Sequence, residues 1–138
     1  MNSKPNSRKK DENDSLNFKN IFIGTVLGMV MFFGLTSLYT LLYLENSGNA
    51  SMFKPIGIIF GFLGASLGGF ITARPIRKKG AIFGGITGAT VALTLSVILF
   101  FVNKSSAGMG IFIFIGVTLL GGIIGGITAV NLKFKKKY

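Results

Sequence analysis

The sequence predicts an all-α, polytopic membrane protein with four transmembrane helices arranged as two hairpins. Four apolar runs contain no Asp, Glu, Lys, Arg or His, and they cover Ile21–Leu44, Pro55–Ala73, Ala81–Val102 and Ile111–Leu132. Each run is long enough to cross, as a helix, a hydrocarbon layer roughly 30 Å thick. Sixteen of the 20 glycines lie inside these runs. With 49% hydrophobic residues in 138, little polar sequence is left for a soluble surface, so we expect one membrane-embedded domain over residues 21–132.

A soluble helical bundle is the alternative interpretation of these four apolar runs. Helices of soluble bundles carry a charged or strongly polar face at a spacing of 3.6 residues. The segments Gly57–Ala73 and Gly110–Ala129 carry no such face. The pattern therefore favours membrane spans.

The net charge of +11 is distributed in a way that predicts the orientation of the chain. Thirteen of the 15 Lys and Arg residues fall in three segments: Lys4, Arg8, Lys9, Lys10 and Lys19; Arg74, Arg77, Lys78 and Lys79; and Lys133, Lys135, Lys136 and Lys137. Cytoplasmic loops of membrane proteins are enriched in Lys and Arg. The protein is therefore predicted to lie in the cell membrane. Both of its termini and the loop between the second and third spans are predicted to be on the cytoplasmic side. Anionic lipid headgroups, rather than nucleic acid, are the partner that this basic charge indicates.

The segments outside the spans are short and polar. Residues 1–20 carry three of the four acidic residues beside basic ones and are expected to form a disordered basic cytoplasmic tail, and residues 133–138 form a second basic tail. Pro75 disfavours continuation of the second helix, so Arg74–Gly80 is expected to form a tight inner turn.

Short sequences recur between the two predicted hairpins. Leu67-Gly68-Gly69-Phe70-Ile71 in the second span is echoed by Leu120-Gly121-Gly122-Ile123-Ile124 in the fourth. Each hairpin also runs from inside to outside and back. A parallel internal repeat would relate the hairpins by an axis along the membrane normal. Glycine-rich apolar segments also resemble one another by composition alone, so both explanations stay open.

Small residues spaced four apart predict the faces on which the helices pack. They are Gly24 and Gly28 in the first span, Gly57, Gly61, Ala65 and Gly69 in the second, and Gly121, Gly125 and Ala129 in the fourth, and the third presents Gly85, Ala89, Ala92 and Ser96 along one face. Such faces let helix backbones approach closely in lipid, where the hydrophobic effect gives no drive for association. Val91 is expected to lie off the small-residue face of the third span.

Polar groups inside the spans are almost all hydroxyls, including Thr87, Thr90 and Thr94 along the third helix. A threonine can donate to a backbone carbonyl one turn back, so we expect a structural role for them. The sequence contains no Cys or His, and none of the acids lies within an apolar run. No catalytic, cofactor-binding or metal-binding residues are predicted, and an enzyme is not expected.

The stretch LGGFITARPIRKKGAIFGGITGA at 67–89, followed by GGIIGGITAVNL at 121–132, resembles a family of small four-span integral membrane proteins from low-GC Gram-positive bacteria. In that family a glycine-rich second span also leads through a short basic loop to a glycine-rich third span. The resemblance covers roughly residues 55–132 and implies fold and location. The function of that family is unassigned, so no ligand or residue role follows from it.

These observations favour a non-catalytic scaffold or accessory subunit that associates with other membrane helices through its glycine-rich faces. The alternative is a small transporter or channel formed by homo-oligomerisation, because hydroxyl-lined helices from several copies could enclose a path. A protein that shields the membrane from a peptide is a third possibility, which no particular residue supports.

Reporter fusions test the predicted orientation. We expect cytoplasmic signals at the C-terminus and within Arg74–Gly80, and external signals within Glu45–Lys54 and Asn103–Gly110, because the basic residues are so unevenly distributed. Neutralising Arg74, Arg77, Lys78 and Lys79 together should scramble the orientation of the third span, whereas neutralising Lys104 should have no measurable effect. An external C-terminus would contradict the assignment.

Overall fold

The computed structural model describes residues 4–45, 53–76, 79–102 and 108–134. These residues form four α-helices: α1 (Lys4–Glu45), α2 (Phe53–Ile76), α3 (Gly80–Val102) and α4 (Met109–Phe134). All four are long and apolar enough to cross a membrane. The all-α fold class and the four spans expected from the sequence are therefore confirmed.

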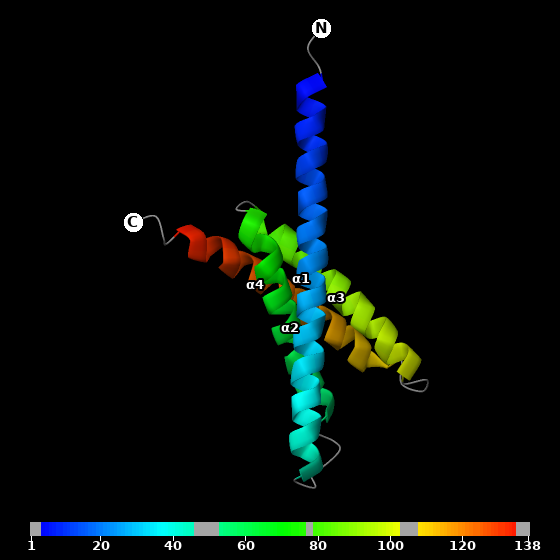
Figure 1. Ribbon diagram of the computed structural model, residues 1–138. Coiled ribbons are helices and arrows are strands. Elements are labelled where there is room, and N and C mark those ends of the chain that lie inside the picture. The colour runs from blue at the N-terminus through cyan, green and yellow to red at the C-terminus, as the bar shows by residue number, and fades with distance from the viewer. Residues whose placement is uncertain (1–3, 46–52, 77–78, 103–107, 135–138) are drawn as a thin grey trace.

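The first helix begins much earlier than expected. α1 is continuous from Lys4 to Glu45, so that residues 4–20 are helical where the sequence suggested a disordered tail. The apolar span of α1 supplies a preformed helix on which the polar residues add one backbone hydrogen bond each, without a new nucleation step. Figure 1 shows this N-terminal part of α1 projecting well beyond the other helices.

The turn between α2 and α3 follows a proline in the last turn of α2 and includes a residue with a left-handed backbone conformation. Pro75 lies inside the last turn of α2, which ends at Ile76. Lys79 has φ of 59°, in the left-handed region. Its carbonyl oxygen accepts hydrogen bonds from the backbone N–H groups of Ile82 at 3.0 Å and Phe83 at 3.2 Å, which starts α3. The chain thus reverses direction within a few residues, as the sequence predicted for Arg74–Gly80.

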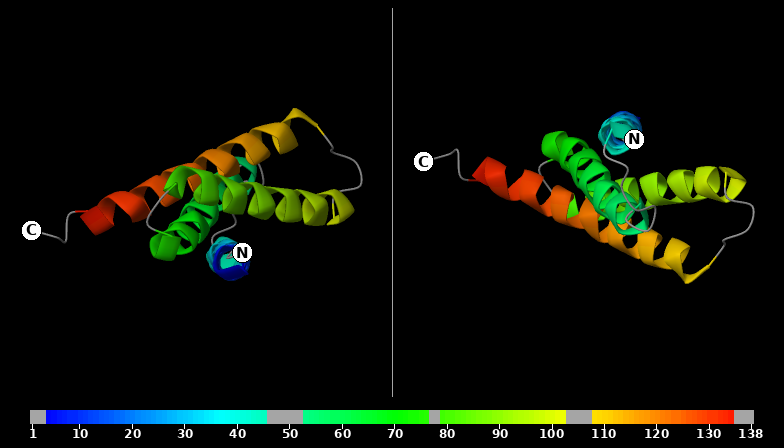
Figure 2. Two further views of the ribbon diagram at one scale, coloured as in Figure 1. Left: turned by 90° about the horizontal axis from the view of Figure 1, so that it is seen from above. Right: turned by 90° about the horizontal axis from the view of Figure 1, so that it is seen from below.

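The helices pack as two crossed hairpins. α1 lies along α2, and α3 pairs with α4 at a different tilt (Figures 1 and 2). The main contact between the two hairpins is that between α2 and α4. α2 also contacts α1 and α3, so it touches all three other helices. α1 occupies the edge of the bundle, where only 17% of its apolar span is buried, compared with 39% for α2.

The centre of the bundle is a small apolar cluster. It combines Phe32 of α1, Ala65 of α2, Val91 and Leu95 of α3, and Phe114 of α4. The rings of Phe32 and Phe114 meet edge to face, with their centroids 6.2 Å apart. Large side chains elsewhere point outward, such as Phe101 and Phe112, which are 75% and 77% exposed. Apolar surface of this extent suits contact with lipid rather than water.

The suggested repeat is visible in one respect. Gly68 of α2 packs on Gly24 of α1, and Gly122 of α4 packs on Gly84 of α3, so each echoed glycine doublet supplies a contact within its own hairpin. The faces differ, however, because the first glycine of one doublet and the second of the other make these contacts. The duplication itself stays a prediction.

Replacing Lys79 by glycine should stabilise the fold. A side chain in the left-handed region costs roughly 1–2 kcal/mol, which Gly avoids, although Gly gains entropy on unfolding. We expect Lys79→Gly to raise the free energy of unfolding in mixed detergent micelles by up to about 1 kcal/mol. Lys79→Ala is the matched control, because it removes the same charge and keeps the strain. An equal gain in both variants would assign the effect to charge.

Candidate functional site

The candidate site is the set of glycine faces at which the helix backbones touch. Gly24 and Gly28 of α1 face Gly64 and Gly68 of α2. A Cβ atom on Gly68 would lie 2.7 Å from the Gly24 carbonyl oxygen, and one on Gly64 would lie 2.8 Å from that of Gly28. Contacts this close leave no room for a side chain. They suit weak Cα–H···O=C interactions, which recur at helix–helix interfaces.

The second backbone contact joins α3 to α4. A Cβ atom on Gly122 would lie 2.5 Å from the Gly84 carbonyl oxygen and 2.6 Å from the Gly88 Cα. Gly126 makes the equivalent approach to Gly80 and Gly84 one turn further along. At Gly84, Gly88, Gly122 and Gly126 neither helix has a side chain, so the two backbones are in direct contact there.

The third contact joins the hairpins through α2 and α4. Gly121 and Gly125 of α4 face the backbone carbonyl groups of Phe62 and Ser66, and Gly69 of α2 faces the Gly122 carbonyl group. Gly61 accommodates the ring of Phe114, since a Cβ atom on Gly61 would lie 3.0 Å from the Cζ atom of that ring. The Cβ positions of Gly121 and Gly125 therefore point toward α2 and those of Gly122 and Gly126 toward α3, while the Gly122 carbonyl group also meets Gly69 of α2.

The structure distributes the predicted packing residues unevenly. Gly61, Gly69, Gly121 and Gly125 lie in the contacts between helices, and Ala65 and Ala129 are 0% and 2% exposed. Gly57 differs, because no heavy atom of another residue lies within 4 Å of its Cβ position. It is near the start of α2, away from the crossing.

The two glycines of α3 that contact α4 lie one residue before the predicted Gly85 and Ala89, whereas the predicted Ala92 and Ser96 are buried. Gly84 and Gly88 meet the backbone of α4, whereas Gly85 meets only the side chain of Ile123, at 3.3 Å, and Ala89 is half-buried. Pairing through Gly85 and Ala89 would leave the Ala89 methyl group between the backbones. The line of Gly84 and Gly88 allows a closer approach and is therefore preferred.

Val91 is also placed differently from the expectation. It is fully buried in the central cluster, and one of its methyl groups lies 3.4 Å from the Cβ position of Gly28. The expectation that it lies off the packing surface is wrong. α3 contacts α1, α2 and α4, so a single small-residue face does not describe its buried surface.

The sequence analysis identified only one of the two glycine faces on α2 and on α4. Gly64 and Gly68 of α2 and Gly122 and Gly126 of α4 form second faces with the same spacing of four residues. The signal was present in the glycine doublets, since adjacent glycines on a helix point about 100° apart and can serve two neighbours.

The threonine hydroxyls are paired mainly within their own helices. Thr87, Thr90 and Thr94 donate to the carbonyl oxygens of Phe83, Ile86 and Thr90, at 2.9, 2.9 and 2.8 Å. The expected backbone pairing is confirmed. Three contacts between helices add to it. Thr87 lies 2.9 Å from the Thr72 hydroxyl, the hydroxyls of Thr25 and Thr90 are 3.2 Å apart, and Thr72 donates to the Asn20 carbonyl oxygen of α1 at 3.3 Å. Such bonds average about 0.6 kcal/mol in membranes.

Three of the predicted topology residues, Arg74, Lys79 and Lys133, lie at one end of the bundle. Arg74 and Lys79 are exposed there, and Lys133 is in the last turns of α4. Arg77, Lys78, Lys135, Lys136 and Lys137 lie outside the described residues. Within the described part of the chain, no group of three or more His, Cys, Asp or Glu could hold a metal ion. The site as it stands offers close packing and hydroxyl contacts.

A protein-family comparison matches residues 17–129, which include most of all four helices. The family is described as "Protein of unknown function (DUF3792)". The chain belongs to the DUF3792 family. Membership in a family of unassigned function is thereby shown, and together with four apolar helices it indicates a multi-pass membrane protein. Comparisons with curated proteins and with solved structures give no match.

In this DUF3792 protein, Gly122→Ala should be strongly destabilising. The new methyl group meets backbone atoms of Gly84 and Gly88, which cannot rotate away, so α3 and α4 must separate. We expect a loss of about 1–3 kcal/mol in the free energy of unfolding, measured by titration with SDS in mixed micelles.

Gly116→Ala is the matched control on the same helix. Nothing lies within 4 Å of the Gly116 Cβ position, so this exchange should be neutral or stabilise by up to about 1 kcal/mol through helix propensity. Equal effects of the two substitutions would show that the backbone contact at Gly122 contributes nothing to stability.

Proposed function

We propose that this protein is a non-catalytic scaffold or accessory subunit of the cell membrane, which associates with other membrane helices along α1. The observation that carries this proposal is the peripheral position of α1. Its apolar span is the least buried of the four, at 17%, and Val30 and Leu41 on its lipid-facing side are 61% and 62% exposed.

The glycine faces themselves are a weaker candidate for binding a partner than the sequence suggests. The close-contact glycines of α2, α3 and α4 already face backbones of the same chain. A partner helix could reach them only by displacing an existing helix. On α1, in contrast, Gly34 is exposed and has no atom within 4 Å of its Cβ position, so a partner backbone could approach there without displacing anything.

A non-catalytic role is supported by the chemistry that the spans can offer. The apolar runs contain no acid, base or thiol, and the buried polar side chains of the described residues are Thr72, Thr87, Thr118 and Ser96. The three threonines donate to carbonyl oxygens of their own helices. A hydroxyl held in this way is a poor proton carrier or nucleophile.

Location and lipid contacts follow from charge and resemblance. The basic residues support an orientation with both termini in the cytoplasm, where anionic headgroups attract Lys and Arg. The resemblance to proteins of low-GC Gram-positive bacteria supports the cytoplasmic membrane of such a cell as the location.

A homo-oligomeric transporter or channel is the second candidate. The observation that favours it is the pair of hydroxyl contacts between helices, Thr25 with Thr90 and Thr72 with Thr87. Thr72 and Thr87 are each 0% exposed, however, so ions or water could use them only after the helices part.

Crosslinking in the membrane distinguishes the two functions. A photoreactive amino acid at Val30 or Leu41 should capture a discrete membrane protein, because both positions are on the lipid-facing side of α1. The captured protein is identified by mass spectrometry. Leu93 of α3, which is 59% exposed, is the matched control and should give no such product.

Capture of a second copy of the chain alone would favour the oligomeric interpretation. Vesicle flux assays then decide between the candidates. We expect no flux from the reconstituted protein, and Thr87→Val should leave crosslinking at α1 unchanged. A flux that Thr87→Val abolishes would overturn the scaffold proposal.

A further inference from the structure

The first part of the α1 span lies on α2 without inserting a large side chain. Among residues 17–31, the buried ones are Gly24 and Gly28. Both lie against the glycine face of α2, and large apolar side chains of the same segment, such as Phe22 and Val26, are exposed. Separation of this part of α1 therefore leaves no large hole among the other helices.

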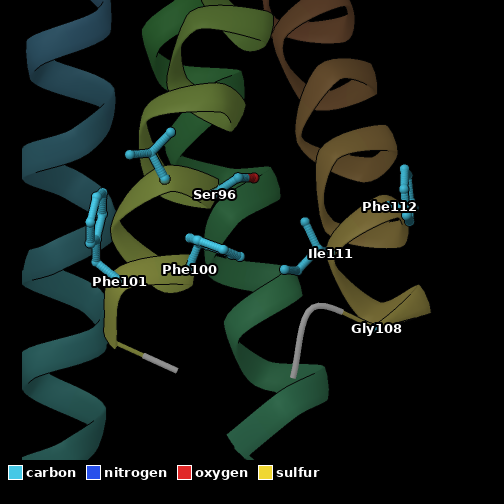
Figure 3. Close-up of a pocket in the computed structure, with 7 residues that line it drawn as sticks. Ser96, Phe100, Phe101, Gly108, Ile111 and Phe112 are labelled. Atoms are coloured by element: carbon cyan, nitrogen blue, oxygen red, sulfur yellow. The ribbon is translucent and has the colours of Figure 1, made fainter. Parts of the chain in front are cut away.

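The α3–α4 hairpin shows the other way in which helices of this bundle meet. α3 and α4 diverge away from their glycine contact (Figure 2), and bulky side chains, among them Leu95 and Phe114, fill the centre of the bundle. Beyond this cluster an apolar groove opens, into which Phe100 and Ile111 point (Figure 3). Interdigitated side chains must rearrange before such helices part, because protein interiors are closely packed. The glycine contact of α1 has no such requirement.

Two hydroxyl contacts also connect this part of α1 to its neighbours. Thr72 of α2 donates to the Asn20 carbonyl oxygen at 3.3 Å, and the hydroxyls of Thr25 and Thr90 are 3.2 Å apart. Gly24 makes room for the first contact, because a Cβ atom on Gly24 would meet the Thr72 hydroxyl. Hydroxyl bonds between helices are weak in membranes, so these contacts stabilise the docking of α1 only modestly.

Each polar group in these two contacts also has a partner in its own helix. The three hydroxyls donate to carbonyl oxygens one turn back, at 2.8, 2.9 and 3.0 Å: Thr25 to Ile21, Thr90 to Ile86 and Thr72 to Gly68. A hydroxyl has one proton, so Thr72 donates either to Asn20 of α1 or to Gly68 of its own helix. The Asn20 carbonyl lies within the continuous helix α1 and accepts from a backbone N–H of that helix. Separation therefore leaves no polar group unpaired in lipid, which is the condition that the hydrocarbon layer imposes.

Beyond this segment, α1 is anchored by aromatic rings. Phe32 is 8% exposed in the central cluster, and its ring meets that of Phe114 edge to face. Tyr39 packs on Phe60 of α2, with the ring centroids 6.0 Å apart. Gly24 lies about 12 Å from Phe32 along the helix, at 1.5 Å per residue. A small tilt of α1 about Phe32 is therefore enough to separate Gly24 from α2.

We propose that α1 pivots at Phe32, so that residues 20–28 lift from α2 and uncover Gly68 and Thr72. Thr72, which is 0% exposed in the structure, then faces lipid with its hydroxyl bonded to the Gly68 carbonyl oxygen. Because α1 is one continuous helix, the segment that projects beyond the bundle tilts with it (Figure 1). The position of that segment is thereby coupled to exposure of the glycine face of α2. This motion within one molecule is separate from docking of a partner on the outer side of α1.

Pulsed electron paramagnetic resonance on the intact chain in lipid vesicles tests the pivot. The chain has no cysteine, so nitroxides can be attached to introduced pairs. Phe22→Cys with Ile82→Cys reports on the movable part, and Leu41→Cys with Ile59→Cys reports on the part beyond the pivot; all four positions are exposed. We expect the first pair to show a minor longer distance, in up to about a tenth of the molecules. The second pair should show a single distance.

Gly24→Ala should make the longer distance of the first pair the major one. The new methyl group meets the Thr72 hydroxyl and the Gly68 carbonyl oxygen, which lies 2.6 Å from the Cβ position. The distance of the second pair should not change. Gly34→Ala is the matched control on the same helix, because nothing lies within 4 Å of the Gly34 Cβ position, and it should leave both distances unchanged.

Thr72→Val tests the hydroxyl contact without a steric clash. It keeps the shape of the side chain and removes the donor to Asn20, so the longer component should grow about threefold, as expected for one hydrogen bond in a membrane. Thr94→Val is the matched control, since the Thr94 hydroxyl donates within its own helix, and it should change nothing. An unchanged distribution in Thr72→Val would overturn the proposal even if Gly24→Ala failed to assemble.

Two further results would contradict the pivot. A single short distance in Gly24→Ala would mean that the bundle accommodates the methyl group without moving α1. Longer distances for both pairs in that variant would mean that α1 leaves as a whole or that the bundle loses its structure. The purified protein is measured without a partner, so neither result bears on capture of a membrane protein by α1.

Discussion

Direct contact between glycine backbones is the interaction on which the rest of this structure depends. Inside a membrane, apolar side chains gain nothing by leaving lipid for protein, so helices associate through dispersion, weak hydrogen bonds and close fit. In this chain, Gly68 faces the Gly24 carbonyl and Gly122 faces the Gly84 carbonyl at distances that exclude a side chain. The crossing points of both hairpins are therefore set by where glycines occur.

The same contact explains the different roles of the four helices. α2 and α4 each carry two glycine faces, whereas the glycine contacts of α1 are confined to the side that faces α2. α3 meets α4 through Gly84 and Gly88 but diverges from it where Phe and Leu replace Gly. Close packing at one end and a groove at the other are consequences of one gradient in side-chain size.

This use of glycine also limits the function that the bundle can have. A helix face already occupied by another helix of the same chain is not free for a partner. Gly61 and Gly121 therefore contribute to the packing of this bundle rather than to binding a partner. The outer side of α1 has no such backbone contact, and its exposed apolar side chains leave it open to a partner.

The sequence by itself determined the number, type and approximate limits of the spans, because length and the absence of charge are local properties that lipid selects directly. It also indicated the pairing of the threonine hydroxyls, since a carbonyl one turn back is always within reach. Only the tertiary structure decided which face of each helix meets which neighbour. Gly84 and Gly85 are equally small, and the choice of Gly84, with Val91 turned into the core, depends on three helices packing at once. The helical start at Lys4 was likewise not readable from polar composition, because it continues from the apolar span that follows it.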